Sequence, residues 1–151
     1  MIDIILDEKP ISISIRYNGY YKIVLLLAII KYCGISKKAS LQLIHIVFWS
    51  LRKQSNYQIL LDLSNQLRKS LVPWTFEHGI DEVLALGYIN GYIERVIVTD
   101  TLEIKLTDKG DDIINSINEF NLFQDEIQRI MALGKIPKTR LNTANNHWTL
   151  I

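Results

Sequence analysis

The sequence predicts an α+β fold that is mostly α-helical, and three observations in the stretch Phe76–Phe120 predict it. First, apolar residues recur at helical spacing over Glu77–Leu86, which indicates a short helix. Second, two runs rich in β-branched residues follow, Tyr92–Val98 and Leu102–Leu106, and the turn Thr99-Asp100-Thr101 between them indicates a hairpin. Third, another helical pattern follows the hairpin. Helix, two-stranded wing and helix in this order are typical of a winged helix-turn-helix.

The residues at the ends of these elements fit the same prediction. Gly87 is expected to end the first helix, and Thr107 is expected to cap the second through its side-chain oxygen. We expect Gly110 to let the second helix pack close to the hairpin, because a residue without Cβ needs less space. The apolar positions of the second helix are Ile113, Ile114, Ile117 and Phe120.

The chain before this stretch is predicted to add two strands and two buried helices. Alternating apolar and polar residues predict a pair of strands within residues 1–19. Tyr20–Cys33 is apolar on nearly every side, so we expect it to form a central helix. Leu41–Leu51 is predicted as a second, mostly buried helix, with Ser36 or Ser40 as its cap.

The segment between these helices and the winged element is predicted to hold one more helix. Gln54–Asn56 is predicted to be a connection, and Tyr57–Leu71 an amphipathic helix with leucines on one side and polar residues on the other. Val72–Phe76 is interrupted by a proline and is expected to be an extended edge segment.

The C-terminal part is predicted to hold a helix and a tail. A helical pattern after Phe120 is expected to end at Gly134, and Pro137 to start a last short turn. The polar run after Leu141 predicts a tail outside the core, with a linker at Thr143–Asn146. The predicted division is a strand pair in residues 1–19, a winged-helix domain with flanking helices in 20–141, and a C-terminal tail in 142–151.

Composition bounds the class of protein. The chain has 151 residues, of which 48% are hydrophobic, and a net charge of +1, which suits one domain with a packed core. The single cysteine, Cys33, cannot form a disulfide within the chain, which favours a reducing compartment. The longest apolar run, Ile23–Ile30, is too short to span a membrane, and the acidic N-terminus is not a signal peptide. We therefore expect a cytoplasmic protein with no membrane contact.

The sequence contains no recognisable catalytic, cofactor or metal site. His45, His78 and His147 lie far apart and share no ligand spacing, and His45 is expected to be a hydrogen-bonded core histidine. Cys33 is expected to be a buried structural thiol. The pair Asp111-Asp112 is expected to be a solvated helix cap, because acids in a first turn match the helix dipole. No phosphate-binding loop is present, so we expect neither an enzyme nor a bound cofactor.

Charge separates the predicted winged helix from DNA. From residue 77 to 126 the chain has three basic and twelve acidic residues, and the helix predicted at Glu77–Leu86 has no Lys or Arg. DNA affinity depends on neutralising phosphates with basic side chains, so this surface is expected to repel a duplex. Residues 1–76 instead have ten basic and four acidic residues. The candidates for a minor nucleic-acid contact are therefore the basic pairs Lys37/Lys38, Arg52/Lys53 and Arg68/Lys69, which are otherwise expected to be solvated helix ends.

Aromatic and acidic residues suggest a protein interface instead. Trp and Tyr are enriched at protein interfaces, and this chain has more of them than a small core needs near its surface. Trp74 is equally well explained by core packing, and Trp148 could dock on its own domain or on a partner. The candidate interface residues are Trp74, Glu77, Asp81, Glu82, Tyr88, Tyr92 and Trp148.

Six segments, taken in order, resemble one protein family. They are Tyr21–Ala28, Leu41–Arg52, Pro73–Glu77, Ala85–Ile89, Leu106–Gly110 and Leu133–Ile136. In this order and spacing, residues 20–150 resemble the middle component of the ABC-three-component systems, the small accessory subunit of Lamassu-type bacterial antiviral defence. The Leu106–Gly110 pattern alone occurs in many winged helices, so the resemblance rests on the ordered set.

The resemblance implies a role in a complex. The partners it implies are an SMC-like ABC ATPase with long coiled coils and an effector subunit, often a nuclease. The small subunit of that family is not an enzyme; it bridges the complex and helps couple DNA sensing to the effector. The resemblance therefore implies contact with DNA only through the complex, and it supplies no catalytic residues to transfer.

Two other functions are compatible with parts of the pattern. A MarR-like winged-helix transcription regulator is the main alternative, although it needs a basic recognition helix and the predicted helix is acidic. An enzyme of unrecognised type is the third.

Overall fold

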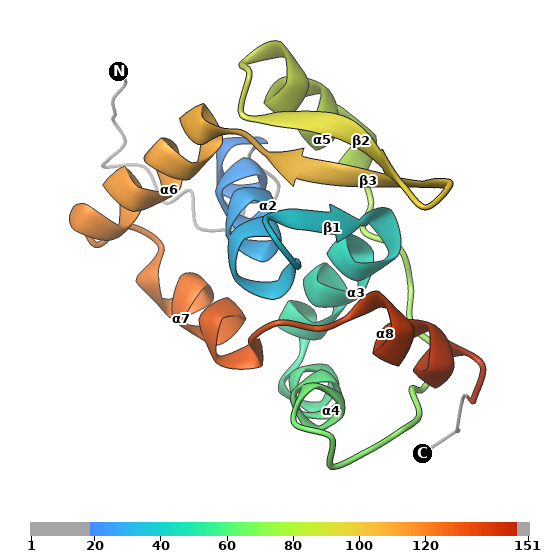
Figure 1. Cartoon of the computed structure of the whole chain (residues 1–151). Coiled ribbons are helices and arrows are strands. Elements are labelled where there is room, and N and C mark those ends of the chain that lie inside the picture. The colour runs from blue at the N-terminus through green and yellow to red at the C-terminus, as the bar shows by residue number, and fades with distance from the viewer. Residues whose placement is uncertain (1–18, 148–151) are drawn as a thin grey trace.

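The structure is a computed structural model that describes residues 19–147. Within this range the chain forms seven helices and one three-stranded antiparallel sheet (Figure 1), which confirms the predicted α+β, mostly helical class. The strands predicted within residues 1–18 and the Trp148 end of the tail lie outside the described residues. In chain order the elements are α2 (Gly19–Cys33), β1 (Lys38–Ser40), α3 (Leu41–Arg52), α4 (Gln54–Ser64), α5 (Ile80–Ile89), β2 (Ile93–Val98), β3 (Thr101–Leu106), α6 (Asp108–Glu119), α7 (Gln124–Leu133) and α8 (Lys138–Asn145).

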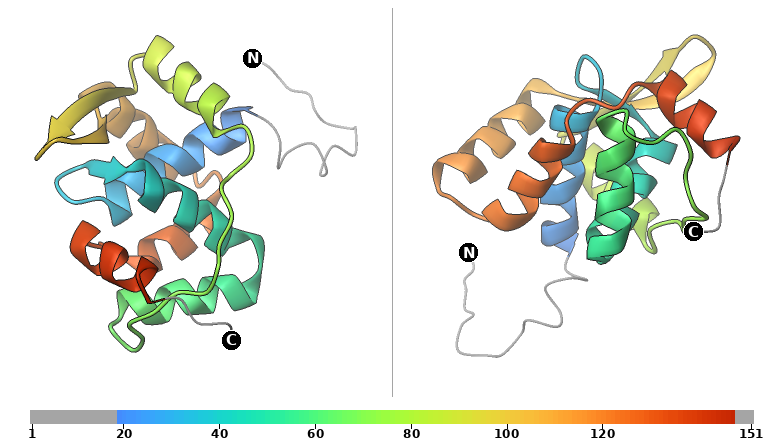
Figure 2. Two further views of the ribbon diagram at one scale, coloured as in Figure 1. Left: turned by 90° about the vertical axis from the view of Figure 1, so that its right-hand side faces the viewer. Right: turned by 90° about the horizontal axis from the view of Figure 1, so that it is seen from below.

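Helix α2 is the centre of the molecule, as its sequence predicts. Every residue from Tyr21 to Ile30 is buried. A helix that is apolar on all sides can be stable only when other elements cover each of its faces. Helices α3, α5, α6 and α7 and strands β1 and β3 supply that cover (Figures 1 and 2). The predicted burial of α3 is also confirmed, since Leu43–Ser50 is buried throughout.

The sheet has the order β1-β3-β2, and β1 was not predicted. Its three residues are too few to indicate a strand, and they pair with β3 across a long stretch of sequence. A tight turn leads into it, with Ser36 and Lys37 both at positive φ. Gly34 precedes the turn because a Cβ there would collide with the backbone carbonyl of Lys38. Of the two predicted caps for α3, Ser40 is the one: its hydroxyl oxygen accepts the backbone N–H of Leu43 at 3.2 Å.

The predicted hairpin and the start of the following helix are confirmed. Strands β2 and β3 pair from Ile93↔Leu106 to Val98↔Thr101, and the two turn residues Thr99 and Asp100 have positive φ, as a tight two-residue hairpin turn requires. Thr107 caps α6 by accepting the backbone N–H of Gly110 at 3.1 Å. Gly110 is buried where a Cβ would collide with the carbonyl of Tyr92, so its predicted close approach to the hairpin is also confirmed.

Two helices were predicted with the wrong boundaries. Helix α5 covers Ile80–Ile89 rather than Glu77–Leu86, and Gly87 lies inside it rather than ending it. The missing Cβ of Gly87 leaves room for Ile93, whose Cδ1 would lie 2.7 Å from a Cβ at this position. Helix α4 covers Gln54–Ser64, so the predicted connection at its start is helical.

Residues 65–79 contain no helix or strand, although a helix was predicted up to Leu71 and an edge segment after it. Leu67 completed the apolar spacing that predicted the longer helix. Its side chain is instead 75% exposed, and the chain turns at Gln66, which has positive φ. This segment is called the 65–79 connection below.

The last helix replaces the predicted linker. Pro137 precedes α8, and Leu141 and Ala144 on its inner side are fully buried. A linker at Thr143–Asn146 is therefore wrong, because the helix continues to Asn145 and packs on the domain. Polar residues at the exposed positions of a short amphipathic helix produced the misleading polar run.

Candidate protein interface

Helix α5 presents an exposed face that mixes acidic and aliphatic side chains. Ile89 is 80% exposed, and the helix places it on the same side as the acids of the first turn. No basic side chain of residues 19–147 forms an ion pair with Asp81 or Glu82. We call this the α5 face; its exposed residues are Asp81, Glu82, Ala85, Leu86 and Ile89.

A groove of about 320 Å³ lies beside the α5 face, between α5 and the hairpin. Its walls are mostly apolar, with Leu102 from β3 opposite Ala85 from α5. The guanidinium of Arg95 lies 4.8 Å from the ring centre of Tyr88, which is a cation–π distance. This contact packs the half-buried Tyr88 ring against the hairpin at the groove. The α5 face and the groove together offer apolar contacts next to an unpaired acidic turn.

Glu77 belongs to the interior rather than to this face. Its carboxylate accepts Lys22 Nζ at 2.8 Å and Arg52 Nη2 at 3.0 Å, and its side chain is 13% exposed. Burial alone would raise the pKa of Glu77, but the hydrogen bonds and charges of Lys22 and Arg52 outweigh it and leave the pKa below its ordinary value. Glu77 therefore ties the 65–79 connection to α2 and α3.

Trp74 and Tyr92 lie apart from the α5 face. The indole N–H of Trp74 donates to Asn145 Oδ1 at 2.9 Å, and its ring contacts Phe76 edge-on at 5.2 Å. The half-buried indole thus packs against its neighbour Phe76 in the connection and against the end of α8. The half-buried ring of Tyr92 is covered by Lys109, whose Nζ lies 5.5 Å from the ring centre. Trp148 lies outside the described residues.

The structure thus brings together three of the seven predicted interface residues, Asp81, Glu82 and Tyr88. Sequence reasoning missed Leu86 and Ile89, because it ended the helix at Gly87. It also missed the groove, because the groove forms only where Arg95 and Leu102 of the hairpin lie next to α5 in the folded chain. The signal available in the sequence was helical spacing: Leu86 and Ile89 follow Glu82 at i+4 and i+7, which places all three residues on one side of a helix.

Two of the six basic candidates, Lys37 and Arg52, form ion pairs within the molecule. Lys37 Nζ lies 3.1 Å from Asp111, which Lys31 also contacts, and Arg52 binds Glu77. Asp111 is therefore not the solvated cap that was predicted: the hydrogen bond from Lys31 lowers its pKa more than burial raises it, and Lys37 adds to the effect. The others are placed differently: Lys38 is in β1, Lys53 is exposed between α3 and α4, and Arg68 and Lys69 are in the 65–79 connection.

The residues considered for chemistry have structural environments. His45 Nδ1 accepts the backbone N–H of Glu77 at 2.9 Å, which confirms a hydrogen-bonded core histidine, and burial lowers its pKa. Cys33 is buried, and burial raises the pKa of its thiol to about 12, so it holds its proton. Among residues 19–147, no group of three or more His, Cys, Asp or Glu side chains could hold a metal ion.

Comparison with known proteins gives no match: no family model, curated protein or solved structure is significantly similar to the chain. None of the helices described by the structure is both long and apolar enough to cross a membrane.

Proposed function

We propose that this chain is a non-catalytic accessory subunit that docks on a protein partner through the α5 face, within a winged helix whose usual DNA-reading helix has been turned to protein binding. One observation carries the proposal: α5, which we take as the counterpart of a recognition helix, exposes two acids that form no ion pair within residues 19–147 and two aliphatic side chains, and it contains no Lys or Arg. In this proposal the hairpin of β2 and β3 corresponds to the wing; β1 pairs with β3 in the same sheet.

The geometry departs from a helix-turn-helix in one respect. In such motifs the recognition helix follows its partner after a short turn. Here α4 and the 65–79 connection lie between α3 and α5. The connection is nevertheless fixed at Glu77. Lys22 and Arg52 bind the carboxylate of Glu77, and His45 accepts its backbone N–H. The insertion keeps α5 against α2 while giving the chain extra surface.

A duplex is a poor ligand for α5. Phosphate neutralisation supplies most of the affinity of DNA-binding domains, and two unpaired carboxylates at the start of α5 oppose it. Protein interfaces instead reward aliphatic and aromatic contact with a polar rim. Leu86, Ile89 and the groove beside Tyr88 supply the apolar contact, and Asp81 and Glu82 supply the polar rim. The partner surface is therefore expected to be apolar with basic residues at its edge.

The ordered sequence resemblance gives the partner its identity within the proposal. The partner is an SMC-like ABC ATPase of an antiviral defence complex, and this chain bridges that ATPase to an effector, often a nuclease. The role needs a stable domain with more than one docking surface and no active site. A MarR-like transcription regulator is the competing function, and it requires α5 to contact DNA.

A tagged pull-down from the native host tests the proposal. The wild-type chain should recover an SMC-like ATPase, and Ile89→Glu should abolish the recovery by adding a third like charge to the α5 face. Leu67→Glu is the matched control, because Leu67 is an equally exposed aliphatic residue outside this face. Both variants should unfold at the wild-type temperature. Recovery of only RNA polymerase or promoter DNA, or equal loss in both variants, would contradict the proposal.

A further inference from the structure

A second surface, on the other side of the sheet from α5, carries positive charge. Residues 63–76 and 127–147 contain no Asp or Glu, and the fold places parts of these two stretches side by side where the end of α4 meets α8 (Figure 1). A hollow of about 320 Å³ lies between them. We call it the α8 hollow; its polar lining is Gln66, Arg68, Lys69, Thr139, Arg140 and Thr143.

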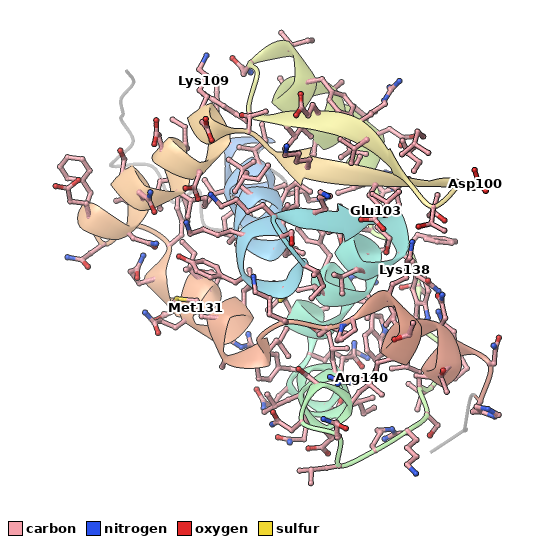
Figure 3. The ribbon with its side chains drawn as sticks, viewed as in Figure 1. Asp100, Glu103, Lys109, Met131, Lys138 and Arg140 are labelled. Atoms are coloured by element: carbon pink, nitrogen blue, oxygen red, sulfur yellow. The ribbon has the colours of Figure 1, made fainter. Side chains whose placement is uncertain are left out.

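No carboxylate of residues 19–147 lines this hollow. The nearest acid in the sequence, Asp62 on α4, accepts a hydrogen bond from Gln58 at 2.8 Å and is not part of the lining. Arg140 donates from Nη1 to the carbonyl of Ser64 at 3.1 Å, and Figure 3 shows it on the side of α8 that faces α4. A carbonyl orients a guanidinium without neutralising its charge. Arg140 is thus held at the hollow as a full positive charge.

Lys69 adds a second charge from the 65–79 connection. Its side chain is exposed, in contrast to Lys37 and Arg52, which lie against carboxylates. Lys138 lies between two lining residues, Pro137 and Thr139, but it is used internally, since its Nζ pairs with Glu103 at 2.9 Å (Figure 3). The fold therefore neutralises several cations elsewhere and leaves Lys69 and Arg140 facing the same hollow.

We propose that the α8 hollow binds backbone phosphates of nucleic acid, without regard to base sequence. Guanidinium, ammonium and threonine hydroxyl groups are phosphate ligands, and two threonines line the hollow together with Lys69 and the arginines. Within the described part of the chain the lining has no aromatic side chain, whereas the cores of protein interfaces are rich in Tyr and Trp and poor in Lys. A nucleic acid backbone suits this surface better than a protein does. The site is separate from the α5 face, so it stands independently of the proposed docking function.

Fluorescence anisotropy of the full chain with a labelled duplex of unrelated sequence tests the inference. Near physiological salt the dissociation constant should lie within about 10⁻⁶ to 10⁻⁴ M, and affinity should rise steeply as salt is lowered to about 50 mM. At low salt, Lys69→Glu should weaken binding roughly tenfold and reduce the salt slope by about 1. Arg140→Gln should act in the same direction, and the double variant should lose more than either.

The matched control is Lys53→Glu, which makes the same charge change at an exposed lysine outside the hollow. It should change affinity by no more than about twofold. Because Arg140 also holds Ser64, thermal melts accompany each variant, and the exposed Lys69→Glu decides the outcome if Arg140→Gln unfolds. Failure of the wild-type chain to bind at low salt would overturn the inference. So would equal loss in Lys53→Glu, or binding of poly-glutamate or anionic vesicles as tight as that of the duplex.

Discussion

The acids on either side of Gly79 show how differently neighbouring charges are used. Glu77 is enclosed by Lys22 and Arg52, whereas Asp81 and Glu82, only four and five residues later, are exposed and outside any ion pair with a described basic residue. Glu77 holds the 65–79 connection in place. The others face outward from the first turn of α5. An acidic run in the sequence therefore divides into a structural carboxylate and an exposed acidic pair.

The same division explains the charge asymmetry of the chain. Basic residues of the first half bind acids of the second half inside the fold: Lys22 and Arg52 bind Glu77, and Lys31 and Lys37 bind Asp111. Charges counted along the sequence therefore overstate both the acidic character of the second half and the basic character of the first. What remains at the surface is more local, with acids on the α5 face and cations at the α8 hollow.

The largest expected effect comes from removing the structural carboxylate. Glu77→Gln removes the carboxylate that pairs with the Lys22 ammonium, whose side chain is only 11% exposed. Breaking a buried pair on one side is strongly destabilising, and for this partly solvated one we expect the free energy of unfolding to fall by about 2 kcal/mol. Urea denaturation measures it. Glu82→Gln is the control and should change the free energy by less than about 0.5 kcal/mol. Equal losses of unfolding free energy in the two variants would contradict the different roles of Glu77 and Glu82.

A smaller effect is expected at Asp111. Asp111→Asn removes the contacts to Lys31 and Lys37, but both lysines are more exposed than Lys22, so we expect a loss of about 1 kcal/mol. Asp112→Asn makes the identical change one residue later, at an exposed position. Both carboxylates lie near the positive end of α6, so the control removes the shared helix-dipole contribution. A loss as large in Asp112→Asn would show that the dipole, rather than the lysines, accounts for the effect.

The sequence predicted what depends on local pattern. The continuous apolar run of α2, the hairpin and the Thr107 cap were all correctly placed, because spacing and residue type decide them. The start of α5 was missed because Glu77 is held by Lys22 and Arg52 from distant helices. Periodicity contains no information about such partners. The α8 hollow was missed for the same reason, since Lys69 and Arg140 meet only through the tertiary packing of α8.

Acid should act on the same connection through His45. Burial lowers the pKa of His45 below its ordinary 6.5 more than the charges of Glu77 and Asp81 raise it, so the unfolded chain binds more protons than the folded one below pH 6.5. Stability should therefore fall as the pH drops through that value. A second loss should begin below about 4.5, where Glu77, whose pKa is also lowered, is protonated first in the unfolded chain. Urea denaturation at a series of pH values measures both.

The variant His45→Gln separates the two losses. Its amide oxygen can accept the backbone N–H of Glu77 without titrating, so the decline that starts near pH 6.5 should disappear while the one below about 4.5 remains. A decline near pH 6.5 that persists in this variant would assign it to another group.

The smallest effect on stability, and the sharpest test of the comparison, is expected on the α5 face. Asp81→Asn with Glu82→Gln removes two exposed charges, so the free energy of unfolding should change by less than about 0.5 kcal/mol. Association with the proposed ATPase partner should nevertheless weaken, and its salt dependence should shrink, because charges at the edge of an interface act mainly on electrostatic attraction. Binding kinetics at low and high salt measure both. If the double variant associates as the wild type does at every salt concentration, the acids do not contribute, and docking would depend on Leu86, Ile89 and the groove alone.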